Sequence, residues 1–246
     1  MSKKREDENY TFLEINKKQY KLSWIVILPL YFYILKNFCI IPVARLCTVN
    51  TETASFMPMV ALIRNTLILI LIIIVYREYM RDALSALSRD KISNTVKWLL
   101  RGFLYVFVAR IVDGIVCMVI NHIKPEDLVN HTSENQQRVN AFLDSNIGLA
   151  VISTVLIAPI VEEMVFRVVI FHTMRKANVF FAIIGSSVIF GILHVWKELI
   201  SGSSMAFVYA ISYFGTAMAL SILYEKRKNI ILCILLHMMV NIISIF

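Results

Sequence analysis

The sequence predicts an all-α fold, a polytopic transmembrane bundle of about seven helices. Hydrophobic residues make up 58% of the 246 residues and charged residues only 17%, whereas soluble domains carry about 25% charged residues. The apolar residues fall in stretches of about 20, the length at which a helix crosses a bilayer. The net charge of +8 comes from basic residues gathered in short segments between these stretches, a pattern typical of membrane proteins.

Seven apolar stretches satisfy the length rule for a membrane-spanning helix. They cover residues 22–45, 58–76, 98–121, 146–171, 179–197, 205–224 and 229–246. The first is interrupted by Pro29, Lys36 and Pro42, so we expect it to be kinked or partly interfacial.

The distribution of Lys and Arg predicts the orientation. Residues 1–21, 77–97, 172–178 and 225–228 carry six, five, two and three of them, whereas the alternate segments carry four in all. Because basic residues concentrate on the cytoplasmic side, we expect a cytoplasmic N-terminus. The bilayer accounts for the positive charge, so no nucleic-acid partner is expected. No cleavable signal peptide is expected either, because the first apolar stretch is too long and follows a polar arm.

The segments between the spans lead to three smaller predictions. Residues 77–97 have apolar side chains at helical spacing, which indicates an amphipathic helix on the cytoplasmic surface. Residues 122–145 are polar and acidic, which indicates an external loop in which His122 and His131 are solvated rather than metal ligands. The four Cys residues are interpreted as apolar filler rather than as disulfides or metal ligands.

Ionisable side chains are costly inside a bilayer and usually face the helix bundle or water. In the first three predicted helices we favour structural roles, with Arg64 and Arg101 extending toward the interfaces and Arg110 pairing with Asp113 one turn away. These residues therefore carry no functional prediction.

The fourth predicted helix contains two adjacent carboxylates, Glu162 and Glu163, followed by Arg167. Glu163 and Arg167 are four residues apart and can form an ion pair on one face, whereas Glu162 is rotated by about 100°. Glu162 can then point into a cavity and serve as a general base. The alternative is a purely structural Glu–Arg clamp between helices.

The fifth and seventh predicted helices add further polar groups at helical spacing. Phe190 and His194 share one face, and His237 and Asn241 share another. Each His could instead be a hydrogen-bonded packing residue. If these faces converge with Glu162, they can activate water and stabilise a tetrahedral intermediate. They can equally provide a zinc site with two His and one carboxylate as ligands.

The three motifs together resemble those of a known family. Glu162–Arg167 reads EExxxR, Phe190–His194 reads FxxxH and His237–Asn241 reads HxxxN. In this order on successive apolar helices they resemble the CPBP group of intramembrane proteases, also called the Abi or type II CAAX prenyl protease group. The resemblance covers roughly residues 150–246. The group includes bacterial proteins tied to bacteriocin immunity and peptide processing, so we expect the plasma membrane of a bacterium.

The resemblance implies a role for each motif residue. Glu162, with His194, would activate the attacking water. His237 and Asn241 would stabilise the oxyanion. Glu163 and Arg167 would hold the first motif in place. Phe190 would contact the substrate.

The resemblance leaves the cofactor open between zinc and none, because the family is described both as metalloproteases and as metal-independent glutamate proteases. A metal would be held by Glu162, His194 and His237. No HExxH motif is present, so no single helix supplies a standard zincin site. The predicted spans place Glu162 about 15 Å and His194 about 24 Å from the cytoplasmic side. Convergence is easier if the fifth helix starts near Ile184.

The domain prediction is a cytoplasmic arm over residues 1–21, three transmembrane helices over 22–145 and a catalytic core over 146–246. The predicted function is an intramembrane endopeptidase that hydrolyses a membrane-associated peptide or protein with an activated water. The alternative is a non-catalytic membrane scaffold that regulates a signalling or bacteriocin-immunity partner. A transporter is disfavoured because the two halves show no repeat.

Overall fold

The computed structural model of the protein describes residues 17–28, 31, 39–46, 56–123, 133–203 and 205–245. Within these ranges the chain is almost entirely helical and contains no strand, which confirms the all-α prediction. Four helical stretches are long and apolar enough to cross a membrane, and two shorter apolar helices accompany them. These six correspond to the second through seventh predicted spans, so the protein is a polytopic membrane protein.

The bounds of the long helices differ from the predicted spans. Helix α3 covers Phe56–Ser88, with a kink at Tyr76 where φ is −110° and ψ is 17°, and α4 covers Ile92–Ile123. The predicted separate surface helix over 77–97 is therefore wrong in its limits, because residues 77–88 continue α3 beyond the kink. Both helices remain apolar enough to span the membrane.

The segment predicted as an external loop is also partly helical. Helix α6 covers Glu134–Ser145, so the loop prediction is wrong for these residues, and His122 lies exposed in the last turn of α4. Helix α1 (Lys17–Leu22) lies mainly in the predicted arm, and the described helical parts of the predicted first span are η1 (Ser23–Ile27) and α2 (Ile41–Leu46). The predictions for residues 1–16, Pro29, Lys36, Cys47 and His131 lie outside the described residues.

The predicted fourth span forms one continuous helical stretch of α and π segments. It runs through α7 (Ile147–Val151), η3 (Ile152–Ile157), α8 (Ala158–Glu163), η4 (Met164–Phe171) and α9 (His172–Arg175). A π segment holds an extra residue per turn and therefore rotates the side chains that follow it; such segments are frequent at functional sites. The carboxylates of α8 lie between two of them.

The fifth span does not start near Ile184, the later start that would have eased convergence of His194 with Glu162, but earlier in the chain. Helix α10 covers Val179–His194, and the side chain of Asn178 caps it by accepting a 2.6 Å hydrogen bond from the Phe181 N–H. Ser, Asn and Asp are favoured at this position because they satisfy an otherwise unpaired N–H. The shorter helix α11 (Trp196–Ile200) follows.

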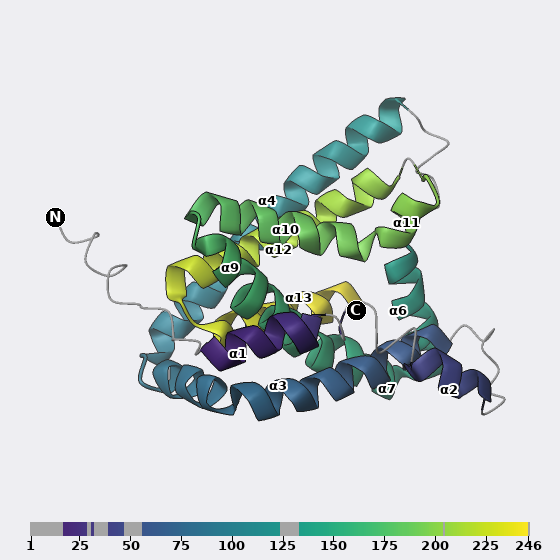
Figure 1. Ribbon diagram of the computed structural model, residues 1–246. Helices are drawn as coiled ribbons and strands as arrows, with labels where there is room; N and C mark the ends of the chain where they lie inside the picture. Colours follow the sequence, from purple (N-terminus) through teal and green to yellow (C-terminus); the bar gives the residue numbers. More distant parts are fainter. Residues whose placement is uncertain are drawn as a thin grey trace. The chain divides into compact units, whose positions relative to one another are not determined.

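The chain forms two compact units, and each is described by itself. In the first unit, which holds residues 90–137 and 170–228, α10 packs on α9 and on α12 (Ala206–Arg227), and α12 also packs on α4 (Figure 1). Small residues allow this approach: a Cβ on Gly215 would lie 2.9 Å from the Ala109 Cβ, and one on Gly191 would lie 3.1 Å from the Ala210 carbonyl oxygen.

The second unit holds residues 11–89, 138–169 and 229–246. Here α3 packs on η3 and α8, and α13 (Ile230–Ile245) packs on the same three elements. Asn229 joins two of these helices: its amide donates to the Ala83 carbonyl at 2.9 Å, and its side-chain oxygen accepts from the Ile231 N–H at 2.9 Å. The start of α13 is thereby both capped and tied to α3.

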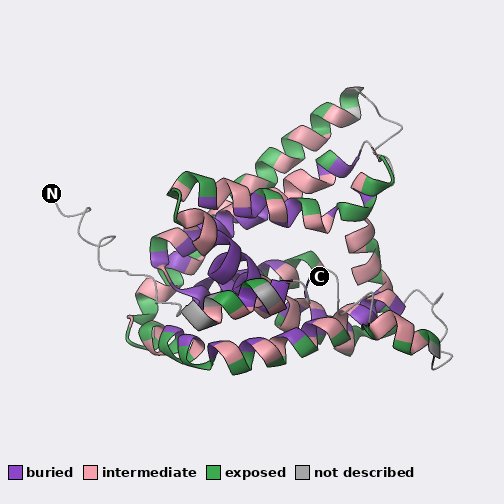
Figure 2. Ribbon diagram, viewed as in Figure 1, coloured by how far each residue is buried: buried purple, intermediate pink, exposed green. Residues whose placement is uncertain are grey.

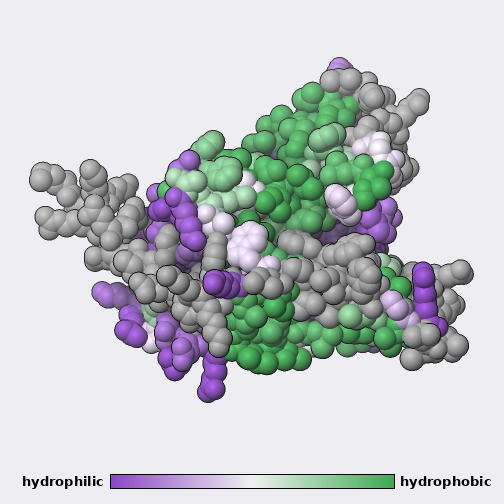
Figure 3. Space-filling model, in the orientation of Figure 1, coloured by the Kyte–Doolittle hydropathy of each residue, from purple (hydrophilic) through white to green (hydrophobic). Residues whose placement is uncertain are grey.

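Apolar side chains cover much of the outer surface of the helices. On α4 the exposed large residues include Leu104, Phe107, Ile111 and Ile115, and Figure 2 shows this helix mainly as exposed or intermediate. The face of the molecule drawn in Figure 3 is hydrophobic over long helical stretches. In water such a surface would be unfavourable, whereas in a bilayer it contacts lipid tails.

One charged contact in the first unit joins the beginning of α4 to the end of α12. The guanidinium of Arg227 donates to the Asp90 carboxylate and lies 5.4 Å from the Trp98 ring centroid, and Asn94 donates to Asp90 at 3.0 Å. Burial acts to raise the pKa of Asp90, but the hydrogen bonds from Asn94 and Arg227 outweigh it and hold that pKa below its usual range.

We predict that Asp90→Asn lowers the free energy of unfolding at pH 7 by about 1–3 kcal/mol, because a charge-assisted hydrogen bond to a buried guanidinium is lost. Since the folded-state pKa is lowered, the wild-type stabilisation is complete above the ordinary Asp pKa of about 3.9 and is lost as the pH falls below it. Thermal unfolding in detergent, followed by tryptophan fluorescence at pH 7 and pH 3, measures both effects.

Asp82→Asn is the matched control, because among the described residues Asp82 pairs with its exposed neighbour Arg81 at 3.3 Å, and such pairs contribute little. Equal stability of Asp90→Asn and the wild type at pH 7 would contradict the role given to this contact.

Candidate active site

A buried carboxylate lies at the centre of the second unit. Glu163, at the end of α8, is completely buried, and so is Arg167 one turn further along the chain. The Arg167 Nε donates to Glu163 Oε2 at 2.9 Å, so the ion pair predicted from the four-residue spacing is present. The pair neutralises a charge that the interior of a membrane protein could not otherwise accommodate.

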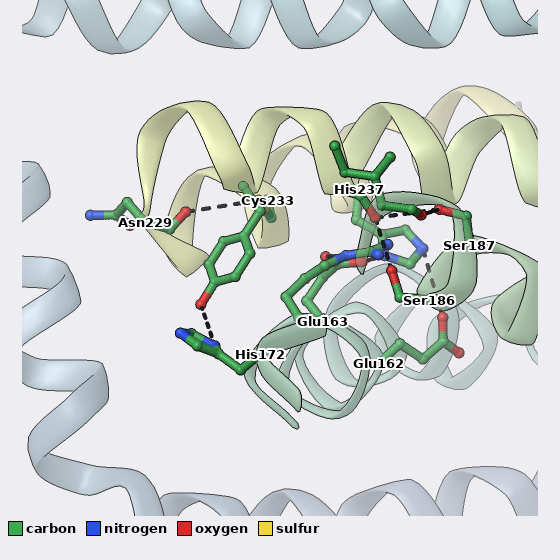
Figure 4. Close-up of polar contacts among 12 residues, drawn as sticks. Glu162, Glu163, His172, Ser186, Ser187, Asn229, Cys233 and His237 are labelled. Carbon is green, nitrogen blue, oxygen red and sulfur yellow. Dashed lines mark hydrogen bonds and ion pairs between the residues drawn. The ribbon is translucent and has the colours of Figure 1, made fainter. Parts of the chain in front are cut away.

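The second oxygen of Glu163 holds a histidine from another helix. Nδ1 of His237, on α13, lies 2.9 Å from Glu163 Oε1 (Figure 4). A carboxylate paired with Arg accepts hydrogen bonds, so we assign the proton to Nδ1. In the neutral ring Nε2 then carries the lone pair. Glu163 thus fixes both the orientation and the tautomer of His237, as the carboxylate of a catalytic triad does.

The adjacent carboxylate has a different environment. The Glu162 side chain is 14% exposed whereas that of Glu163 is 0% exposed, and Glu162 Oε2 lies 3.8 Å from Nε2 of His237 (Figure 4). That separation exceeds a direct hydrogen bond, and one water can bridge it. The two neighbouring Glu residues therefore differ in environment. Glu163 is a buried ion-pair partner, and Glu162 is the accessible carboxylate beside an oriented imidazole.

Asn241 lies one turn beyond His237 on α13. Its amide nitrogen donates to the carbonyl oxygen of Thr154 in η3 at 2.9 Å. An amide NH2 group has two N–H donors, so this bond ties α13 to η3 and uses one of them. Asn241 thus holds the helix that carries His237, and its predicted role toward the oxyanion remains a prediction.

The fifth-helix motif belongs to the first unit. Nδ1 of His194 lies 2.8 Å from the carbonyl oxygen of Phe190, and the ring stacks on Phe190 and on Tyr213, at centroid distances of 4.2 and 4.5 Å. Phe190 is 2% exposed and packs on His194. Its predicted contact with substrate remains a prediction.

The structure therefore brings together Glu162, Glu163, Arg167 and His237 in one cluster, with Asn241 one turn away. His194 and Phe190 form their own group in the other unit. Tyr213 and the Thr154 carbonyl were not predicted from the sequence. Neither belongs to a motif: Tyr213 is one of ten tyrosines, and a backbone carbonyl leaves no signal in a sequence.

Two of the three predicted metal ligands, Glu162 and His237, lie together in the second unit. The described residues contain no group of three His, Cys, Asp or Glu side chains that could hold a metal ion, whereas catalytic zinc takes three protein ligands. Glu162 Oε2 and Nε2 of His237 supply two candidates, and the predicted third, His194, belongs to the other unit. A metal held by all three of these residues therefore remains a prediction.

The fold and these contacts define a class, a polytopic membrane protein with a Glu–Arg–His cluster inside its helices. Comparison with known proteins shows a similarity to one family over the C-terminal part of the chain. Residues 144–243 match the family described as "Type II CAAX prenyl endopeptidase Rce1-like". Over this segment the chain is similar to that family, which confirms the resemblance inferred from the three motifs.

Two curated relatives are similar to the chain. One is the "Putative membrane peptidase YdiL" of Bacillus subtilis (strain 168), 30% identical over 175 residues that cover 70% of this chain and 64% of the relative. The other is the "UPF0177 protein YvdC" of Lactococcus lactis subsp. lactis (strain IL1403), 29% identical over 145 residues that cover 58% and 49%. The chain thus spans less than two thirds of either relative. No solved structure matches.

The different environments of the two Glu residues lead to a stability prediction. Glu163→Gln should lower the free energy of unfolding by about 3–5 kcal/mol, because it leaves the buried Arg167 guanidinium without its counter-charge. Glu162→Gln should change it by less than about 1 kcal/mol, since this side chain retains access to solvent. Thermal unfolding of the purified variants in detergent measures the difference, and equal stabilities for the two variants would contradict this assignment.

Proposed function

We propose that the protein is an intramembrane endopeptidase that hydrolyses a membrane-associated peptide or protein with an activated water. One observation carries the proposal: a buried Glu163–Arg167 ion pair orients His237, whose other ring nitrogen lies 3.8 Å from the accessible carboxylate of Glu162. A structural clamp needs only the ion pair, whereas a second carboxylate and an oriented imidazole beside it provide acid–base chemistry. The family and the name of the Bacillus relative support the same coarse class of membrane protease.

In the proposed mechanism Glu162 is the general base. It removes a proton from a water as the water oxygen attacks the scissile carbonyl carbon, and the carbonyl becomes a tetrahedral oxyanion. His237 and the second N–H of Asn241 stabilise that charge as donors, with Nε2 of His237 protonated for this role. Collapse breaks the C–N bond, and protonated Glu162 returns its proton to the leaving amine. His194 assists in activating the water, a role that rests on the family resemblance.

The remaining parts of the proposal follow from the charge pattern and the family. We place the N-terminus in the cytoplasm, the protein in the plasma membrane of a bacterium and the catalytic core in residues 146–246. The substrate is a peptide or protein in or at the membrane. A prenylated C-terminal peptide is the first one to test, because prenyl processing gives the family its description.

Glu162→Gln is expected to reduce kcat by at least about a thousandfold with an unchanged melting temperature, because the amide cannot accept the proton from water. The assay uses proteoliposomes with a quenched fluorescent farnesylated CAAX peptide, its unprenylated form and a membrane-anchored peptide library, with products identified by mass spectrometry. Glu78→Gln is the control. It makes the same chemical change on the part of α3 beyond its kink, far from the motifs in the sequence.

Cleavage by Glu162→Gln at the wild-type rate would overturn the proposal. If the wild type cleaves nothing and Glu162→Ala still restores a cellular phenotype, the non-catalytic scaffold or regulator is the better assignment. Metal analysis of active protein, combined with chelation, decides separately between a zinc enzyme and a metal-independent glutamate peptidase.

A further inference from the structure

The imidazole of His194 stacks on two aromatic rings. The interplanar angle is 23° with Phe190 and 27° with Tyr213. Phe190 lies one turn earlier on the same helix and moves with it, so it cannot by itself fix the ring relative to the rest of the unit. Tyr213 comes from α12, and it is the stacking partner that relates His194 to a second helix.

Tyr213 is itself anchored at its far end. Its hydroxyl lies 2.9 Å from the Ser133 Oγ, and the Asn135 amide donates to it at 3.3 Å. Ser133 is 5% exposed and also accepts from the Gln136 N–H at 3.2 Å, which makes it the N-cap of α6. The ring that stacks on His194 is thus bonded to the first turn of α6.

The first turn of α6 is in turn held by α11. The carboxylate of Glu198, only 6% exposed, accepts a 2.7 Å hydrogen bond from the Glu134 N–H, and Lys197 pairs with the Glu134 side chain at 3.1 Å. A nearly buried carboxylate on a helix N-terminus satisfies an unpaired N–H and the helix dipole together. All these residues belong to the first unit.

We propose that Tyr213 is a positioning residue for His194 and that the start of α6 sets the position of Tyr213 through its hydroxyl. The inference rests on the proposed function only for the catalytic use of His194. Because the Phe190 carbonyl can only accept, Nδ1 of His194 carries the proton and Nε2 is the basic nitrogen. The two stacked rings then decide the direction in which that basic nitrogen points.

The first test compares Tyr213 variants in the proteoliposome assay with the farnesylated peptide. Tyr213→Phe keeps the ring but removes the hydroxyl that meets Ser133 and Asn135, so it should lose about two- to fivefold in kcat. Tyr213→Leu should lose about 10- to 100-fold with KM changed less than threefold, because a small misplacement of a catalytic group is costly. Tyr105→Leu, a half-buried Tyr on α4, is the matched control. Wild-type kcat in Tyr213→Leu would overturn the inference.

A double variant separates positioning from general destabilisation. In the His194→Ala background Tyr213→Leu should have no further effect, because it acts through the ring that is already absent. Multiplicative losses would overturn the inference. If His194→Ala alone is fully active, the catalytic role of His194 fails instead, and the two failures are thereby distinguished.

A readout independent of activity uses 15N-histidine labelling, which gives few signals because the chain has five His residues. In the wild type, the His194 signals, assigned by their loss in His194→Ala, should report a neutral ring with the proton on Nδ1. In Tyr213→Leu, or in Tyr213→Met if the Leu variant does not fold, these signals should shift and broaden. Unchanged His194 signals in the folded variant would overturn the inference.

Discussion

The pairing of one buried carboxylate with two partners underlies the candidate site. Glu163 has no exposed surface, and each of its oxygens meets a separate donor, Arg167 Nε and His237 Nδ1, both at 2.9 Å. Without the guanidinium the carboxylate could not remain charged at this depth, and without the charge it would not orient the imidazole. The same ion pair therefore stabilises a buried charge and keeps the carboxylate able to orient the His237 imidazole.

The contacts of the buried Glu163 carboxylate also join helices to one another. Arg167 lies on the same helical stretch as Glu163, while His237 comes from α13, so the hydrogen bond to His237 is also a contact between helices. The Asn241–Thr154 and Asn229–Ala83 bonds join α13 to the neighbouring segments at either end. In a bilayer, where lipid tails compete equally for apolar faces, such polar contacts and close packing of small residues specify which helices meet.

The two imidazoles of the motifs are oriented by different means. A buried carboxylate holds His237, whereas a backbone carbonyl and two aromatic rings hold His194. Both arrangements assign the proton to Nδ1 and leave Nε2 as the basic nitrogen. A carboxylate partner stabilises a protonated ring, so His237 suits donation to a developing negative charge. The contacts described for His194 are a carbonyl oxygen and two aromatic rings, and its proposed role is to assist in activating the water.

The sequence by itself determined the membrane class, six of the helices, the family motifs and the Glu163–Arg167 pair. These are local: a span depends on about 20 consecutive apolar residues, and a four-residue spacing places two side chains on one face wherever the helix lies. Predictions from the sequence were wrong where contacts with other segments determine the structure. The polar composition of residues 134–145 indicated a loop, but these residues form α6, whose first turn is anchored by Glu198 and Tyr213. Only the tertiary structure decided that Glu163 rather than Glu162 holds His237, and that Tyr213 stacks on His194. Those contacts depend on which way one helix is rotated toward another, and residues 74 positions apart in the chain leave no periodic signal of their meeting.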